Sequence, residues 1–341
     1  RTVIGGTTPE QRNVIAFQRG AGIRVPGRGA SETQIIGNLI GTRRIARALA
    51  SGAASSQSNA QGGIYSDDAP ATQIGGTAAG AGNIISGNGT AGIILFRSGT
   101  AGTVVQGNLI GTDQDGGAAL ANGGTGIILD GVDDVLIGGS DPNAGNVISG
   151  NVALGIIAEN NANRITITGN LIGTDRTGTI ALGNQQGGVR LRDVRDCVIG
   201  GAEPEARNLI SGNGGIGLAL TGSSATRNVI QGNYIGLDRD GGLALGNSDA
   251  GVLIESSNNL IGGTGAGERN VISGNRTTGL RIRTGAAAGN IVQGNYIGTD
   301  QTGQQILGNG EDGVLLFNAP RNVIGGTEPN AGNVIAGNQR H

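Results

Sequence analysis

Residues 146–184 read NVISGNVALGIIAENNANRITITGNLIGTDRTGTIALGN, and this stretch decides the fold. Short runs with alternating aliphatic residues, such as GIIAE, RITIT and LIGT, stand between turns rich in Gly, Asn and Asp. Runs this short, bounded by such turns, are typical of β-strands rather than of amphipathic helices. The stretch therefore predicts three short strands in close succession.

The composition of the whole chain agrees with this pattern. Of the 341 residues 70 are Gly, which is about a fifth of the chain against an average of ~7%. All 23 basic residues are Arg, the aromatic residues are three Tyr and three Phe, and neither Trp nor Met occurs. So much glycine excludes an ordinary helical or doubly wound protein, and only a regular period separates the chain from a disordered, low-complexity one.

Such a period is present throughout the chain. The motif Ile-Gly-Gly recurs in steps of 70, 63, 62, 62 and 63 residues, starting at Ile4, Ile74, Ile137, Ile199, Ile261 and Ile324. The motifs Asn-x-Ile-x-Gly-Asn and Gly-Asn-x-Ile-Gly recur with the same step. Self-similarity at a fixed step predicts a repeat architecture.

Strands that begin with glycine occur twice in each period. Ten of them start at Gly22, Gly63, Gly92, Gly126, Gly155, Gly188, Gly217, Gly251, Gly279 and Gly313. The first residue after these glycines is always aliphatic, as in Ile156, Val189 and Leu218. Aliphatic residues stacked on aliphatic residues, with three strands per turn, predict a parallel β-solenoid. We expect an all-β, single solenoid over residues 1–341 with about ten coils, a double-coil repeat of ~62–63 residues and no second domain.

Asparagine occupies a fixed position in each Gly-Asn-x-Ile-Gly motif. These residues are Asn38, Asn108, Asn170, Asn233 and Asn295. We expect them at tight corners with a left-handed backbone, which Asn tolerates, and we expect their amides to bond from coil to coil.

With these motifs the chain resembles the right-handed parallel β-helix repeat proteins of the pectate-lyase-like superfold. It is most similar to long bacterial surface proteins with N-x-I-x-G-N-x-I-G-T-D-x-x-G-x-x-x-L-G-N repeats. The resemblance covers essentially the whole chain and implies a right-handed, single-stranded parallel β-helix. It does not fix an activity, because the superfold includes lyases, glycosidases, epimerases, adhesins and inert rods.

The resemblance implies that an enzyme of this superfold would carry its site on the outer face of one parallel sheet, flanked by long loops. Outward positions there include Asp130 and Glu159, about one coil or ~5 Å apart, and Arg190 and Arg192 in the next coil. Two carboxylates at this separation can serve as nucleophile and general acid, and an Arg beside an acid can serve as base or substrate clamp. These four residues are the catalytic candidates for a lyase, epimerase or glycoside hydrolase acting on an acidic polysaccharide.

The same charges also have a structural explanation. Glu159 with Arg192, and Glu255 with Arg283, can form cross-strand ion pairs on a solvated face, each contributing ~1 kcal/mol or less. The only His is His341 and Lys is absent, so the sequence has no Ser-His-Asp triad, no multi-His metal site and no Schiff-base lysine. Without a usable His, the acidic pairs at residues 67–68 and 133–134 are expected to be turn residues.

A recurrent loop that opens with Gly-Thr-Asp, or once Gly-Leu-Asp, is the one candidate cofactor site. Calcium is the cofactor in question, and its candidate ligands are Asp113, Asp175, Asp238 and Asp300. Each Asp has Gly three places on, as in the first half of a calcium loop, but the remaining oxygen ligands and the distal Glu are missing. An Asp that caps its own turn explains the same spacing.

Charge and composition limit the partners. The net charge is −2 with acids and arginines scattered, so nucleic acid is not expected as a partner, and no run approaches the ~18 apolar residues of a membrane span. Cys197 stands alone, which excludes a disulfide framework. The resemblance, with the low Cys and Lys content, predicts an extracellular or cell-surface location in a bacterium.

The two ends of the sequence contain the same part of the repeat, RTVIGGTTPEQRNVIA and RNVIGGTEPNAGNVIA. Neither has an amphipathic segment that would cover a terminal coil, so we expect self-association end to end. Three hypotheses for function remain open. The first is a non-catalytic structural rod or filament subunit, the second is the carbohydrate-active enzyme, and the third is an adhesin module that binds a polysaccharide or a protein.

Overall fold

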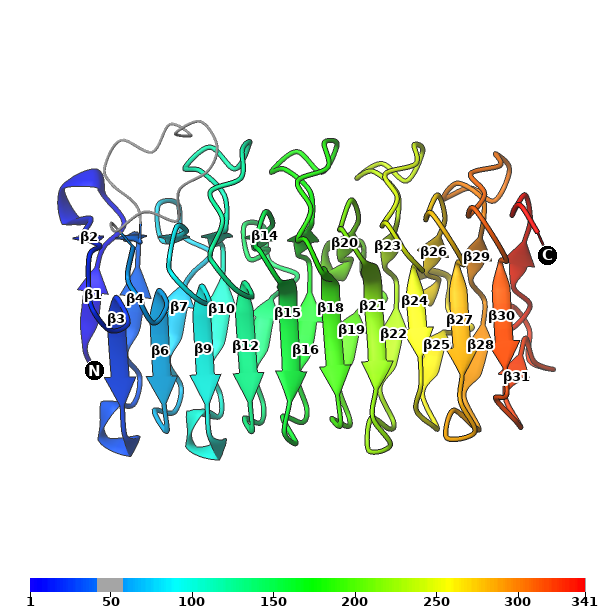
Figure 1. Cartoon of the computed structure of the whole chain (residues 1–341), viewed down its shortest axis with the longest axis horizontal. Helices are drawn as coiled ribbons and strands as arrows, with labels where there is room; N and C mark the ends of the chain where they lie inside the picture. Colours follow the sequence, from blue (N-terminus) through cyan, green and yellow to red (C-terminus); the bar gives the residue numbers. More distant parts are fainter. Residues whose placement is uncertain (42–57, 341) are drawn as a thin grey trace.

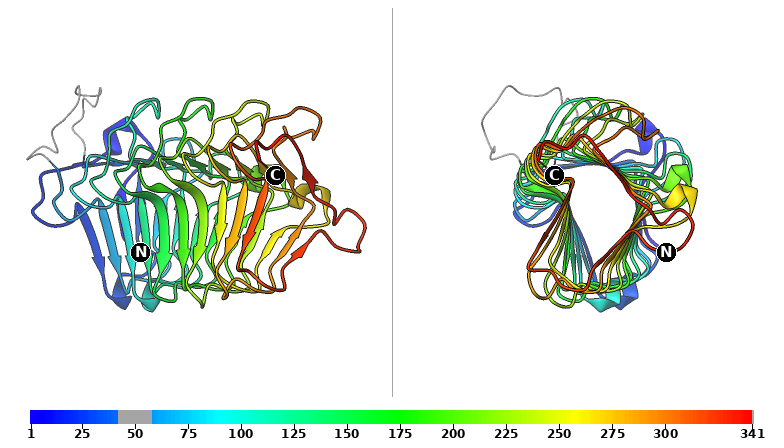
Figure 2. Two further views of the ribbon diagram at one scale, coloured as in Figure 1. Left: turned by 45° about the vertical axis from the view of Figure 1, so that its right-hand side comes forward. Right: turned by 90° about the vertical axis from the view of Figure 1, so that its right-hand side faces the viewer.

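The computed structural model describes residues 1–41 and 58–340. In these residues the short runs form three parallel sheets, called A, B and C below, which wind around one axis (Figures 1 and 2). The chain is therefore an all-β, right-handed parallel β-helix repeat protein, and the predicted fold class is confirmed. Along the chain each coil passes through sheet C, then sheet A, then sheet B.

Within each sheet the strands follow one another in chain order. Sheet A contains β1 (Val3–Gly5), β4 (Gln34–Ile36), β7 (Gln73–Gly75), β10 (Val104–Gln106), β13 (Leu136–Gly138), β16 (Thr166–Thr168), β19 (Val198–Gly200), β22 (Val229–Gln231), β25 (Leu260–Gly262), β28 (Ile291–Gln293) and β31 (Val323–Ile324). Sheet B contains β2 (Val14–Ile15), β5 (Leu39–Ile40), β8 (Ile84–Ile85), β11 (Leu109–Ile110), β14 (Val147–Ile148), β17 (Leu171–Ile172), β20 (Leu209–Ile210), β23 (Tyr234–Ile235), β26 (Val271–Ile272), β29 (Tyr296–Ile297) and β32 (Val334–Ile335). Sheet C contains β3 (Ile23–Pro26), β6 (Ile64–Asp67), β9 (Ile93–Phe96), β12 (Ile127–Asp130), β15 (Leu154–Glu159), β18 (Gly187–Arg192), β21 (Ile216–Thr221), β24 (Val252–Ile254), β27 (Leu280–Arg283) and β30 (Val314–Phe317). Short 3-10 helices in the connections are η1 (Pro9–Gln11), η2 (Arg28–Ala30), η3 (Ser98–Thr100), η4 (Pro204–Ala206) and η5 (Ala266–Glu268).

Equivalent residues of successive coils lie opposite one another. In sheet C, Ile156 pairs with Val189, and Val189 pairs with Leu218. All three side chains are buried and belong to one continuous core with the inward residues of sheets A and B. Because side chains alternate between the two faces of a strand, this register keeps the aliphatic rows inside and turns the charged residues outward. No helix in the described ranges is long and apolar enough to cross a membrane.

Two ladders of buried asparagines run along the corners of this helix. In the first, Nδ2 of Asn146 donates to Oδ1 of Asn170 at 2.9 Å, and Nδ2 of Asn170 donates to Oδ1 of Asn208 at 3.1 Å. The second ladder joins Asn59, Asn88, Asn122, Asn151, Asn184, Asn213, Asn247, Asn275, Asn309 and Asn338 in the same way. The expected asparagine ladder is confirmed.

The expectation that the ladder asparagines adopt a left-handed backbone was wrong. None of the residues with a positive φ is a ladder Asn of the Gly-Asn-x-Ile-Gly motif, and the preceding Gly takes that conformation instead, with φ 70° at Gly169. Glycine adopts this region without the steric penalty of a Cβ atom. The Asn is therefore required for its amide, which donates to one neighbour and accepts from the other.

Two kinds of coil alternate, and this explains why the sequence repeats every second coil. After β14 the chain continues with Ser149, whose Oγ accepts a hydrogen bond from the N–H of Gly173 at 3.0 Å in the next coil. After β17 the equivalent residue is Gly173, and the chain there makes a longer arch before it re-enters sheet C.

The four described arches comprise residues 111–120, 173–182, 236–245 and 298–307 and line the upper edge of the molecule in Figure 1. An antiparallel bridge closes each arch, for example between Thr174 and Ala181. Each arch also contacts the next, since the N–H of Arg176 donates to the carbonyl of Gly116 at 2.8 Å. The same contact recurs between Arg239 and Gly178 at 3.0 Å. The arches thus form a row of their own, in which one hydrogen bond joins each arch to the next, two coils away.

Candidate functional site

The outer face of sheet C contains the four catalytic candidates in adjacent strands. Asp130 ends β12 and lies opposite Glu159, which ends β15, as the repeat predicted. Arg190 and Arg192 lie in β18, the next strand of the sheet. Since the intervening Leu129 is fully buried, the alternation turns these charged residues outward. The structure therefore brings all four candidates to one surface.

Two of these candidates neutralise each other. Glu159 accepts a charged hydrogen bond from Arg192 in the neighbouring strand. Asp130 is not ion-paired among the described residues, and its Oδ1 accepts a hydrogen bond from Nδ2 of Asn160 at 2.8 Å. Arg190 is half-buried and has no ion-pair partner in the described part of the chain. The arrangement therefore holds one carboxylate in an ion pair and the other in a neutral hydrogen bond.

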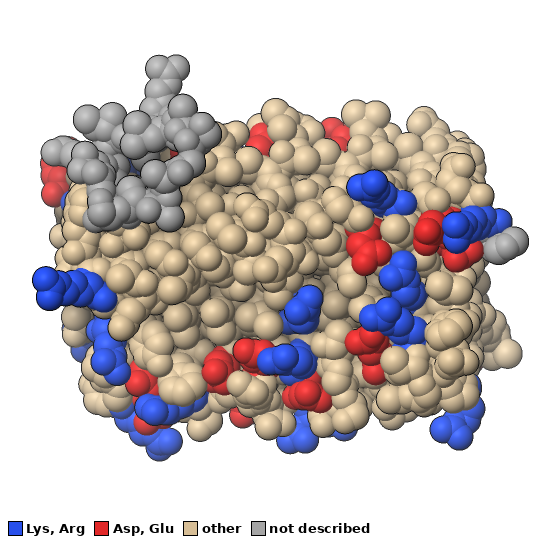
Figure 3. Space-filling model, viewed as in Figure 1, with Lys and Arg blue, Asp and Glu red and all other residues tan. Residues whose placement is uncertain are grey.

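The same pairing recurs along sheet C. Nε of Arg283 lies 2.6 Å from Oε1 of Glu255, which confirms the second expected ion pair. Asp67 is nearly buried and lies 2.8 Å from Arg97 and 3.6 Å from Arg24. Figure 3 shows acidic and basic side chains side by side over this face. Interleaved charges of this kind are explained by pairing between coils.

The two arginines that pair with Asp67 also contact aromatic rings on sheet C. The guanidinium of Arg24 lies 5.5 Å from the ring centre of Tyr65, and that of Arg97 lies 4.7 Å from the ring centre of Phe96. The centres of the two rings are 6.2 Å apart, and the ring planes are tilted by 48° to each other. These contacts are cation–π and edge contacts that stabilise the surface of the first coils.

The carboxylates proposed as calcium ligands are turned toward backbone N–H groups of their own arches. Oδ1 of Asp175 accepts from the N–H groups of Thr179 at 3.1 Å and Ile180 at 3.0 Å, and Oδ2 accepts from the hydroxyl of Thr177 at 2.7 Å. Burial alone would raise the pKa of Asp175, but these hydrogen bonds outweigh it and hold the pKa below its usual value. The carboxylate is thus stabilised as an anion by donors of the protein.

The other three arches repeat this geometry. Backbone N–H groups four and five residues on donate to Oδ1 in each case, namely at Asp113, Asp238 and Asp300. A cation needs several oxygen ligands, whereas donors surround these oxygens. In residues 1–41 and 58–340 no group of three or more His, Cys, Asp or Glu residues is arranged to hold a metal. Turn capping therefore accounts for the spacing of Asp and Gly within the repeats, and calcium binding by these four residues stays a prediction.

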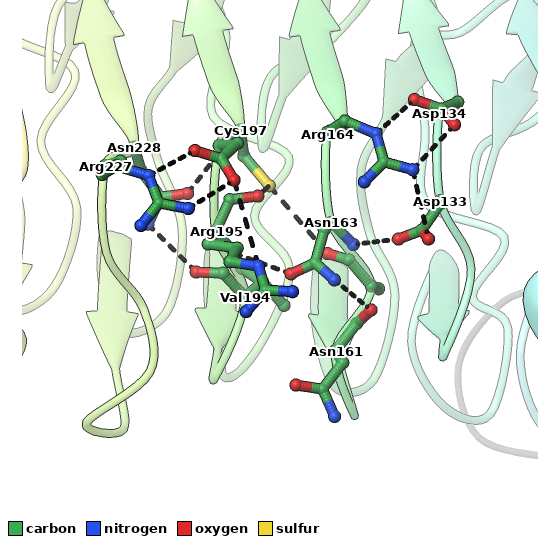
Figure 4. A network of polar contacts seen from close by, with 12 residues as sticks. Asp133, Asp134, Asn161, Asn163, Arg164, Val194, Arg195, Cys197, Arg227 and Asn228 are labelled. Carbon is green, nitrogen blue, oxygen red and sulfur yellow. Dashed lines mark hydrogen bonds and ion pairs between the residues drawn. The ribbon is translucent and has the colours of Figure 1, made fainter.

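A second row of charges lies at the turns between sheets C and A. Arg164 donates to both oxygens of Asp134, at 2.7 and 2.9 Å, and lies 3.2 Å from Asp133 (Figure 4). Two coils on, Arg227 makes the same two-point contact with Asp196, at 2.7 and 2.8 Å. These hydrogen bonds hold the pKa values of Asp134 and Asp196 below their usual range. These ion pairs therefore join turns of neighbouring coils two by two.

The acidic pairs expected in turns are placed there with one exception. Asp68 and Asp134 are turn residues with φ 59° and 57°, and Asp133 lies beside Asp134 in the same turn. The expectation that Asp67 lies in the turn was wrong. Asp67 ends β6 and lies opposite Pro26 and Phe96 in the neighbouring strands of sheet C. Its ion pairs allow it to remain buried at the end of the strand.

Cys197 lies near this row, at the corner that leads into β19. Its N–H donates to Oδ1 of Asn228 at 3.0 Å, so it adjoins a third, shorter asparagine ladder that begins there. Burial raises the pKa of the Cys197 thiol to about 12. The thiol is therefore a packing residue and not a nucleophile. The single histidine, His341, lies outside the described residues.

The chain is similar to two solved structures. No protein-family model matches the sequence, and no curated protein matches it. Among solved structures, the A-module of mannuronan C-5 epimerase AlgE6 of Azotobacter vinelandii is similar at 14% identity, with 91% of this chain covered and a TM-score of 0.42. The A-module of AlgE4 from the same organism is similar at 13% identity, with 90% covered and a TM-score of 0.41. The chain spans 58% of the length of each of these two structures.

Proposed function

We propose that the protein is a non-catalytic structural rod, either a segment of an extracellular or cell-surface solenoid or a subunit of a head-to-tail filament. The observation that carries this proposal is the pairing of charges on the outer face of sheet C. Glu159 is held by Arg192, and Glu255 is held by Arg283. Carboxylates in such ion pairs join neighbouring coils, and this explains their presence without a catalytic role.

The completeness of the internal hydrogen bonding supports the same role. In the described ranges, Oγ of Ser66 is the only buried side-chain nitrogen or oxygen atom without a hydrogen-bond partner. Within the described residues the aliphatic core and the first asparagine ladder continue from coil to coil. A molecule with so few unsatisfied buried polar groups has the properties of a stiff spacer.

The last described coil has an exposed apolar surface. Its strands β30, β31 and β32 expose apolar side chains, among them Phe317, Val323 and Ile335. An uncovered strand edge is a template for another strand. We propose that a second copy of the chain associates end to end with these strands, and head-to-tail contact of this kind builds an open filament.

An activity screen tests the non-catalytic proposal. The purified chain is incubated with uronate polymers, and new reducing ends, unsaturated sugar ends and epimerised residues are measured. We expect no turnover by the unmodified protein or by Glu159→Gln and Asp130→Asn. Turnover by the unmodified protein that either substitution abolishes would overturn the proposal.

Electron microscopy at rising protein concentration tests the self-association. We expect rods that grow end to end without becoming wider. If only short, separate rods are present at every concentration, the filament part of the proposal is wrong.

One observation favours the enzyme as a second candidate. Asp130 and Glu159 lie directly opposite each other in adjacent parallel strands, and the usual strand spacing of ~4.8 Å is close to the ~5 Å between the carboxyl groups of a nucleophile and a general acid. A carbohydrate-active enzyme would use this pair, with Arg190 as the unpaired cation beside it. The same screen decides between the two candidates.

A further inference from the structure

We propose that the outer face of sheet B contains a binding site for an organic oxyanion, a function separate from the structural role proposed above. This face lies between the arches on one side and the turns that join sheets A and B on the other. A hollow of about 410 Å³ opens there over β11, β14, β17, β20 and β23. Pockets that bind small ligands have volumes of this order.

The floor of the hollow is apolar. The first residue of each strand in sheet B faces outward, because the second residue, such as Ile172, belongs to the central core. Leu109 and Leu171 are half-buried residues of this outward row and line the hollow, and Tyr234 lines it at one end. Leu171 and Tyr234 also pack in a small apolar cluster that is separate from the core.

The hollow exists because one position of the repeat is glycine in this coil. In the later coils that position is Arg207 and then Arg269, each of which covers the ring of a sheet B tyrosine. The guanidinium of Arg207 lies 4.1 Å from the ring centre of Tyr234, and its Nε donates to the carbonyl of Gly232 at 3.1 Å. The equivalent residue one repeat earlier is Gly145, which has no side chain to cover Leu171.

Three guanidinium groups surround this floor. Arg207 reaches it from the turn between sheets A and B, and Arg176 and Arg239 reach it from two successive arches. None of the three has an ion-pair partner among the described residues. Asp141 and Glu205 also line the hollow, but both are exposed residues of the turns. Ten of the described arginines have no ion pair, and three of these ten line this one hollow.

This combination defines the chemical class of the ligand. Guanidinium groups bind phosphate, sulfate and carboxylate oxygens through forked, charged hydrogen bonds. The half-buried leucines of the floor provide contact for the apolar face of a ring. The site therefore fits a ring-bearing phosphate, sulfate or carboxylate better than an inorganic anion, which would leave the floor uncovered.

Isothermal titration calorimetry with phenyl phosphate, inorganic phosphate and phenol tests this assignment. We expect phenyl phosphate to bind most tightly, inorganic phosphate to bind more weakly and phenol to give no saturable binding. Because a hydrogen bond to a charged group contributes more than a neutral one, Arg207→Ala and Arg239→Gln should each weaken phenyl phosphate binding by about tenfold. Salt should weaken it as well.

Arg269→Ala is the matched control. Arg269 lies 3.9 Å above the ring of Tyr296 and donates to the carbonyl of Gly294 at 3.0 Å, as Arg207 does at its own tyrosine, but it does not line the hollow. We expect Arg269→Ala to bind phenyl phosphate as the unmodified protein does. No saturable binding of phenyl phosphate, equal loss in Arg269→Ala, or inorganic phosphate bound as tightly as phenyl phosphate would each overturn the proposal. Arg239→Gln, at an exposed residue of an arch, keeps the test valid if Arg207→Ala unfolds. The activity screen for the structural role is independent of all these outcomes.

Discussion

Ser66 is the residue at which the stacked core departs from its own pattern. It faces inward in β6, where Val25 and Leu95 are its partners in the neighbouring strands. The side chain is fully buried, and its Oγ has no hydrogen-bond partner among the described residues. A buried hydroxyl without a partner costs ~1–3 kcal/mol of desolvation free energy. Ser66 therefore lowers the stability of the first coils.

Replacing Ser66 should stabilise the protein. Ser66→Ala removes the unpaired hydroxyl, and we expect the free energy of unfolding in guanidinium chloride to rise by ~1 kcal/mol. Ser149→Ala is the control, because Oγ of Ser149 accepts from Gly173 and donates to the carbonyl of Thr174. That substitution should lower the free energy of unfolding. Destabilisation by both substitutions would show that Ser66 has a partner after all.

The charged turns predict how stability depends on pH. Hydrogen bonds from Arg164 and Arg227 lower the pKa values of Asp134 and Asp196 in the folded protein. A carboxylate with a lowered folded-state pKa stabilises the fold above its unfolded-state pKa of ~3.9, and this contribution is lost as the pH falls through the folded-state pKa.

We therefore expect the melting temperature to fall below about pH 4, and to fall less steeply in Asp134→Asn combined with Asp196→Asn. Asn tolerates the positive φ that Asp134 and Asp196 adopt, so the turns remain intact. Thermal unfolding followed by circular dichroism between acidic and neutral pH measures both slopes. Identical slopes in the variant and the unmodified protein would contradict this account.

At the scale of elements, the asparagine ladders determine how one coil is joined to the next. Asn170 donates to the carbonyls of Ile137 and Thr168 and to Asn208, and it accepts from Asn146. A single amide therefore links two neighbouring coils as well as its own turn. Since all these groups are buried, losing the amide leaves several of them without a partner.

Asn170→Ala should be among the most damaging single substitutions in the chain. We expect the free energy of unfolding to fall by about 3 kcal/mol, because several buried donors and acceptors lose their partner together. Gln114→Ala, in an exposed arch, is the control and should leave stability unchanged. A loss in Asn170→Ala no larger than that in the control would mean that the ladder does not hold the coils together.

The sequence predicts those elements that depend on residues at equal spacing. Ile156, Val189 and Leu218 occupy equivalent positions, so their stacking follows from the repeat. The pair of Asp130 and Glu159 is predicted for the same reason. The exchange of roles between Gly169 and Asn170 was missed, because both residues suit a corner and only the backbone angle shows which one is left-handed.

Contacts between unlike turns could not be predicted in this way. The hydrogen bond from Arg176 to Gly116 joins arches two coils apart. The spacing of these residues in the sequence does not show that the two arches are in contact. The contact of Arg164 with Asp134 depends on the shape of turns whose lengths vary. The hollow over Leu171 depends on the missing side chain of Gly145, an absence that has meaning only when the covering Arg207 is known.

For the whole molecule, the coils wind around one axis with a closed cross-section (Figure 2), and their inward side chains form one continuous core. Eleven strands in sheet A, stacked at the usual strand spacing, give a length of roughly 50 Å. Several ion pairs lie on the outer face of sheet C, and the arches and the proposed anion site lie on other parts of the surface. The structural role depends on this regular stacking, because ladders, ion-pair rows and arches all need equivalent residues of successive coils side by side.

The distance between two arches measures this stacking most directly. Spin labels at Gln114→Cys and Arg239→Cys would stand on exposed arches four coils apart, while the buried Cys197, with its pKa raised to about 12, stays unlabelled. Electron paramagnetic resonance should then give a narrow distance distribution centred at roughly 20 Å. A broad distribution, or one centred far beyond this distance, would contradict the continuous stack of coils on which the structural role rests.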